Sequence, residues 1–108
     1  MRLRLFGRRG SRAGTVRTGS EADTGHLAEF VRTREGVEAY LEPRTTVTET
    51  TVLLVADDGE WTRRRIDGLR GAQAFAKRHR LPLYDVTVVG YPKRMRDYNA
   101  RRKQQGSA

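Results

Sequence analysis

The stretch that decides the fold is TVLLVADDGEWTRRRI, residues 51–66. Its first part, VLLV at 52–55, is the most apolar run of the chain and predicts the central strand of a sheet. Asp58-Gly59 follows as the strongest hairpin signal, because glycine tolerates the positive φ that a tight turn requires. Residues 61–66 are then expected to form the return strand.

Helical and extended periodicities flank this hairpin. Leu27, Phe30 and Val31 recur at the spacing of one helical face, and residues 37–42 alternate apolar and polar side chains as a strand does. The expected elements are a helix from Asp23 or Thr24 to Gly36, a strand over 37–42, the hairpin, a helix over 67–81 and a strand over 84–89. The order α-β-β-β-α-β predicts a small single α+β domain, with a sheet of about four strands and two helices on one face.

The positive charge is concentrated at the two ends of the chain. The 108 residues carry a formal net charge of +9. Six basic residues and no acid lie in 1–20, and six basic residues with one acid lie in 91–108, whereas 21–90 holds ten basic and twelve acidic residues. We expect a flexible basic tail over 1–22, a near-neutral α+β domain over 23–91 and a basic arm, partly helical, over 92–108.

Aromatic and basic side chains share one face of the predicted return strand. Trp61, Arg63 and Arg65 point to the same side, because successive side chains of a strand alternate between faces. If the helices cover the face of Ile66, these three residues form an open strip that stacks a base and pairs a phosphate. The alternative is that Trp61 packs in the core while the arginine stems shield the sheet.

The C-terminal arm repeats this composition. Cations interleaved with tyrosines are typical of a segment that binds RNA and becomes ordered on contact. The candidate residues of the arm are Tyr91, Lys93, Arg94, Arg96, Tyr98, Arg101, Arg102 and Lys103. Alternatively, Met95 and Tyr98, one helical turn apart, dock the arm onto the domain and leave the cations solvated.

Signals of catalysis are missing from the sequence. The chain has no cysteine, which excludes disulfides, thiolate metal sites and thiol catalysis, and it has no dinucleotide fingerprint, P-loop or nucleophile elbow. His26, Glu29 and His79 are interpreted as surface residues, because a zinc site needs three or four convergent ligands. We therefore predict no catalytic residue, no metal and no cofactor.

Four segments of the sequence resemble a known family. They are GVEAYLEPRTTVTETT at 36–51, GEWTRRR at 59–65, YDV at 84–86 and GYPKRMRDY at 90–98. Together they are similar to a family of small uncharacterised actinobacterial proteins, with a likeness that covers about residues 24–103. Members are often labelled oxidoreductases. The resemblance implies a compact cytoplasmic domain and supplies no catalytic residue.

Three functional hypotheses follow from these patterns. The first is a non-catalytic binding module whose cationic arms contact a polyanion, with nucleic acid, as RNA or the ribosome, as the favoured partner. The second is a protein-interaction or membrane-peripheral adaptor that meets an acidic protein or an anionic membrane surface, based on Leu3, Leu5 and Phe6 among the N-terminal arginines. The third is the oxidoreductase of the family label. No secretory signal or membrane span is recognisable, so we expect a cytoplasmic protein.

Overall fold

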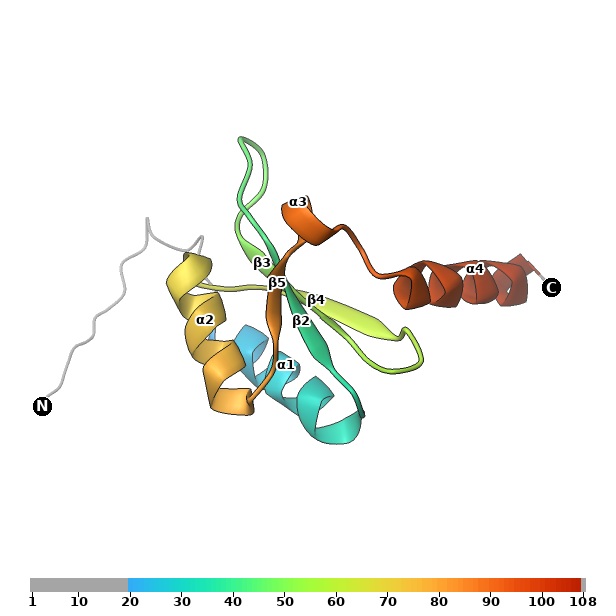
Figure 1. The fold of residues 1–108 in the computed structure, drawn as a ribbon, viewed down its shortest axis with the longest axis horizontal. Coiled ribbons are helices and arrows are strands. Elements are labelled where there is room, and N and C mark those ends of the chain that lie inside the picture. Colours follow the sequence, from blue (N-terminus) through green and yellow to red (C-terminus); the bar gives the residue numbers. More distant parts are fainter. Residues whose placement is uncertain (1–19, 108) are drawn as a thin grey trace, which may run out of the picture.

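A computed structural model describes residues 20–107 of the chain (Figure 1). Its elements are α1 (Glu21–Thr33), β2 (Glu38–Glu42), β3 (Thr51–Val55), β4 (Trp61–Arg65), α2 (Gly68–His79), β5 (Leu83–Asp85), α3 (Val86–Val89) and α4 (Lys93–Ser107). The strands form one sheet in the order β4-β3-β2-β5, in which β2 is antiparallel to β3 and parallel to β5. The predicted α+β class and the order α-β-β-β-α-β are confirmed. Most of the predicted N-terminal tail, with Leu3, Leu5 and Phe6, lies outside the described residues.

α1 begins earlier than the sequence predicts. The Ser20 side chain accepts a hydrogen bond from the backbone N–H of Asp23 at 3.0 Å, and the Asp23 carboxylate accepts one from the backbone N–H of Ser20 at 3.1 Å. This reciprocal capping box satisfies two donors that the first turn would otherwise leave open. Asp23 and Thr24, the predicted caps, therefore lie inside the helix, and the predicted start is wrong.

Apolar side chains are buried on both faces of the sheet. The larger cluster joins α1 and α2 to one face, and Figure 1 shows both helices on that side. On the opposite face, Tyr40, Leu53 and Val55 are buried together with Met95, and Trp61 packs against them. Met95 comes from α4 and is 6% exposed, so its burial contributes about 1.5–3 kcal/mol to folding. Met95 therefore packs the start of α4 against the second face of the sheet.

The predicted hairpin turn is confirmed and also receives α4. Gly59 has φ +91, and its backbone N–H donates to the carbonyl of Ala56 at 2.9 Å. The backbone of α4 lies so close to this turn that a Cβ on Gly59 would overlap the carbonyl oxygen of Arg94. The position thus needs glycine for two separate reasons, its positive φ and the close approach of α4.

The last predicted strand is only partly present. Residues 83–85 form β5, whereas residues 86–89, which the sequence places in the same strand, form the short helix α3. β5 pairs with β2 up to Asp85 opposite Leu41, and β2 ends one residue later at Glu42, so residues 87–89 would lie beyond the end of β2. The Asp85 side chain instead accepts from the backbone N–H of Thr87 at 2.8 Å and caps a helical turn.

Replacing Gly59 with alanine should reduce the free energy of unfolding by about 2 kcal/mol or more, because the new side chain strains the turn and pushes α4 away. Urea unfolding monitored by circular dichroism measures this change. Gly25→Ala is the matched control: Gly25 lies in α1 with open space where a Cβ would sit, and alanine there should be neutral or stabilising by up to about 1 kcal/mol. Equal stability of the two variants would contradict the proposed docking of α4.

Candidate nucleic-acid interface

α4 is anchored to the sheet through Arg94. The Nε of this residue donates to the carbonyl of Ala56 at 2.9 Å, and its terminal nitrogen donates to the carboxylate of Glu38 at 2.8 Å. The Arg94 and Glu38 side chains are each about one third exposed, so the pair is only partly screened by water. Arg94 is therefore held by the domain, and its charge is largely balanced by Glu38.

Two further hydrogen bonds hold the middle of α4. The indole N–H of Trp61 donates to the side-chain oxygen of Asn99 at 2.7 Å, and Arg101 donates to the carbonyl of Asp58 at 2.9 Å. The Arg101 guanidinium also lies over the ring of Tyr98, 5.8 Å from its centroid. The hairpin β3–β4 and α4 consequently form one connected unit.

The carboxylate of Glu42 joins three segments that are distant in sequence. It accepts two hydrogen bonds of 2.7 Å from Arg63, one of 2.6 Å from the Tyr91 hydroxyl and one of 2.7 Å from the Thr51 hydroxyl. Its side chain is 12% exposed. Burial alone would raise the pKa of Glu42, but the donors from Arg63, Tyr91 and Thr51 outweigh it and hold the pKa below 4.5. The same contact with Glu42 raises the pKa of Tyr91.

The predicted assignment of faces on β4 is correct. Thr62 points to α1, where its hydroxyl lies 2.6 Å from Nε2 of His26, so Trp61, Arg63 and Arg65 occupy the opposite face. The strip is only partly open, however. Trp61 is half-buried against the second apolar cluster, and the Arg63 guanidinium lies 5.2 Å from the centre of its ring while pairing with Glu42. Trp61 therefore follows the alternative of packing against the domain, whereas Arg63 and Arg65 are exposed.

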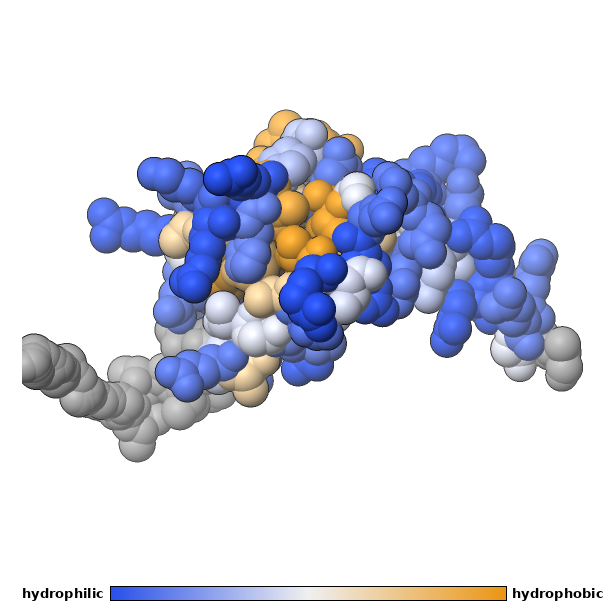
Figure 2. Space-filling model, turned by 90° about the horizontal axis from the view of Figure 1, so that it is seen from below, coloured by the Kyte–Doolittle hydropathy of each residue, from blue (hydrophilic) through white to orange (hydrophobic). Residues whose placement is uncertain are grey.

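Three of the remaining cations of α4 point away from the domain. Lys93, Arg96 and Lys103 follow the spacing of one helical face, turned away from Tyr98, and all three are exposed. Arg96 donates to the carbonyl of Tyr91 at 2.6 Å, and Lys93 pairs with Asp97 at 2.8 Å. Arg102 is exposed as well. Figure 2 shows hydrophilic residues along α4 at the right of the view, whereas apolar residues gather nearer the middle of the molecule.

The structure therefore divides the predicted interface into two groups. One group comes together where α4 meets the sheet, and Arg63, Tyr91 and Arg101 within it are also exposed: Trp61, Arg63, Tyr91, Arg94, Tyr98 and Arg101. The other group is exposed and consists of Arg65, Lys93, Arg96, Arg102 and Lys103. Sequence reasoning missed the acidic partners Glu38 and Glu42. The alternation over 37–42 puts both on the face of Tyr40, which is the face of Arg63 and Arg65 on β4.

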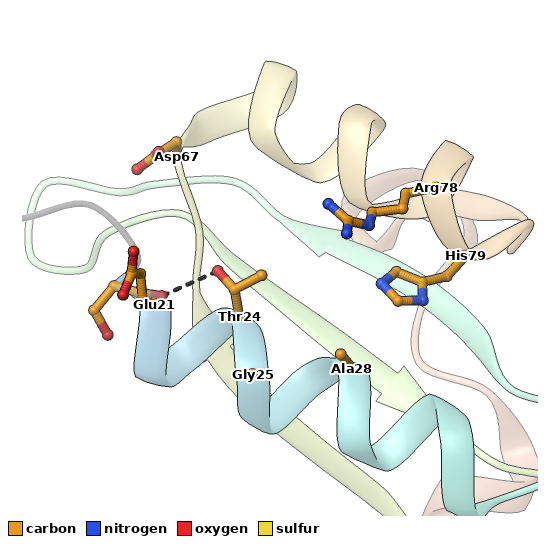
Figure 3. A pocket seen from close by; sticks show the side chains of 8 residues that line it. Glu21, Thr24, Gly25, Ala28, Asp67, Arg78 and His79 are labelled. Atoms are coloured by element: carbon orange, nitrogen blue, oxygen red, sulfur yellow. Dashed lines mark hydrogen bonds between the residues drawn. The ribbon is translucent and has the colours of Figure 1, made fainter. Parts of the chain in front are cut away.

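A groove of about 440 Å³ lies on the opposite side of the molecule, between α1 and α2 (Figure 3). Glu21 and Asp67 lie toward one end, and Arg78 and His79 lie toward the other. The His79 ring packs on Phe75 with centroids 4.4 Å apart, and burial, followed by the neighbouring Arg78, lowers the pKa of His79.

The histidines do not converge on a common point. His26 contacts Thr62 on β4, whereas His79 packs within α2. Among residues 20–107, no group of three or more histidine, aspartate or glutamate side chains is placed to hold a metal ion. In the same part of the chain, no helix is both long and apolar enough to cross a bilayer.

Comparison with protein-family models, with curated proteins and with solved structures gives no match.

Replacing Glu42 with glutamine should lower the free energy of unfolding near neutral pH by about 1–2 kcal/mol, because Arg63 and Tyr91 lose a charged acceptor. The folded-state pKa of Glu42 lies below 4.5, so its contribution is complete above that pH and disappears as the pH falls through the folded pKa. Urea unfolding at about pH 7 and about pH 3 should show the difference between wild type and variant shrinking at the lower pH.

Glu29→Gln serves as the control for this series. Glu29 pairs with Arg32 on the exposed side of α1, with side chains 57% and 70% exposed, so its loss should change stability by less than about 0.5 kcal/mol. A Glu42→Gln difference that does not vary with pH would show that the carboxylate charge is not what stabilises the cluster.

Proposed function

We propose that this protein is a non-catalytic module that binds nucleic acid, with RNA or the ribosome as the partner, through phosphate contacts of α4. The observation that carries the proposal is the placement of a basic helix on a rigid base. α4 has six basic residues and one acid, and Figure 1 shows its far end extending beyond the sheet. Phosphate contacts of this kind provide affinity without reading sequence.

The anchoring of α4 supports a binding role for its charge. A flexible basic tail loses conformational entropy when it contacts a partner, whereas a docked helix presents its cations in fixed positions. Met95, Arg94 and Asn99 hold the first turns, so Arg102 and Lys103 extend from a fixed start. A role in solubility alone would require the positive charge of α4 but not the docking of α4 on the domain.

The composition of the C-terminal half of α4, residues 99–107, favours a nucleic-acid phosphate backbone as the partner rather than a folded protein. A helix that docks into a protein groove uses apolar anchors at i, i+3, i+4 and i+7. Residues 99–107 contain Ala100 as their one apolar side chain, while Arg101, Arg102 and Lys103 are consecutive. Phosphate contacts need cations and no apolar anchor, which is the pattern present.

The double variant Arg102→Gln/Lys103→Gln tests the role of α4. Titration of a fluorescent RNA oligonucleotide by anisotropy, at several salt concentrations, gives the slope of log affinity against log salt. If both cations contact phosphates, the slope should become less steep by about 1.4 for a single strand, and affinity at low salt should fall.

Lys77→Gln/Arg78→Gln is the matched control, because it removes the same two residue types from adjacent exposed positions in the last turn of α2. Its salt slope should equal that of the wild type. Equal losses in both double variants would indicate a net-charge effect without an interface on α4. Absence of any RNA binding by the wild type at low salt would refute the proposed function.

A further inference from the structure

Two tyrosines are exposed on the sheet face against which Met95 of α4 packs. Tyr84 lies in β5 and is 38% exposed, and Tyr91 lies in the connection to α4 and is 41% exposed. Tyr84 is paired in register with Tyr40, whose side chain belongs to the second apolar cluster, and the hydroxyl of Tyr91 contacts Glu42 on the same strand. Both aromatic rings therefore belong to the side of the molecule from which α4 extends.

The ring of Tyr84 is held by the protein and still accessible. Its centroid lies 5.4 Å from that of Tyr40, with a tilt of 37° between the rings. Tyr40 is 5% exposed and has Met95 in its cluster, so it forms a fixed support. β5 is an edge strand of the sheet, which leaves the other side of Tyr84 without a neighbouring strand.

Tyr91 is fixed at its hydroxyl and at its backbone. The hydroxyl donates to Glu42 at 2.6 Å, and the carbonyl accepts from Arg96 at 2.6 Å. Glu42 follows Tyr40 by two positions on β2, a separation of about 7 Å along the strand. An exposed cation, Arg96, thus contacts the backbone of the residue that carries this exposed ring.

We propose that Tyr84 and Tyr91 stack unpaired bases, so that the ligand of this protein is a single-stranded nucleic acid whose phosphates meet α4. The inference rests on the proposed function and adds the class of nucleic acid. Bases in a duplex stack on one another, whereas the bases of a single strand offer a free face to an aromatic side chain. Because both rings are held before binding, little further ordering opposes the contact.

The test compares three ligands of one sequence: a single-stranded RNA of about 12 nucleotides, the same strand with abasic sugars in place of its central nucleosides, and the blunt duplex. Fluorescence anisotropy at low salt gives the affinity of each. Wild-type protein should bind the intact single strand most tightly. The abasic strand keeps every phosphate and loses the bases, so it isolates the contribution of stacking.

Tyr84→Leu and Tyr91→Leu should each lower affinity for the intact strand about tenfold, and should leave the affinity for the abasic strand and the salt slope unchanged. Tyr84→Phe and Tyr91→Phe keep an aromatic ring and should retain the preference for the intact strand. Thermal unfolding of all four variants, followed by circular dichroism, shows whether the fold is preserved. If a leucine variant unfolds, the test rests on the wild-type protein alone, which should bind intact RNA more tightly than abasic RNA.

The outcomes separate this inference from the function on which it rests. Equal wild-type affinity for all three ligands would overturn base stacking and would leave phosphate binding by α4 intact. Folded leucine variants that keep the wild-type preference would also overturn it. Wild-type protein that binds none of the three ligands at low salt would refute the proposed function and the inference together.

Discussion

The burial of Met95 against the second face of the sheet is the contact on which the arrangement of this protein depends. Two helices cover one face, and on the other face the buried side chains of Leu53 and Val55 share their cluster with Met95 of α4. Apolar burial has no preferred direction. It therefore drives α4 to dock on the sheet but does not set the orientation of the helix. Its direction comes from polar contacts around the apolar centre, namely those of Arg94, of Asn99 and of Tyr91 with Glu42.

Local patterns in the sequence predict much of this fold. The apolar run at 52–55, the Asp58-Gly59 turn and the alternation over 37–42 correspond to β3, the hairpin and β2, and strand parity places Trp61, Arg63 and Arg65 on one face. The strand over 84–89 is shortened because strand length depends on a partner, and β2 extends only one residue beyond the partner of Asp85. The early start of α1 is missed because Ser20 is assigned to a tail although it caps the helix.

The candidate site is harder to predict than the fold, because composition gives the number of charged residues but not which of them form ion pairs. Arg63 and Glu42 are separated by 21 positions, and Arg94 and Glu38 by 56. No local pattern links residues so far apart. The sequence identifies an arm rich in arginine and tyrosine. In the structure, part of this arm packs on the sheet and forms hydrogen bonds with it. The exposed remainder, which includes Arg102, is the part that is able to meet a partner.

The chain order of this packing has a consequence for biosynthesis. The hairpin that carries Leu53 and Val55 ends 30 positions before Met95, and β5, the last strand, ends 10 positions before it, so a nascent chain releases every strand of the sheet before Met95 leaves the ribosome. Until then, one face of a finished sheet is bare, and surfaces of this kind promote aggregation of incompletely synthesised chains. A premature stop codon after β5 would make that state permanent, and the product would be a substrate for chaperones and proteases.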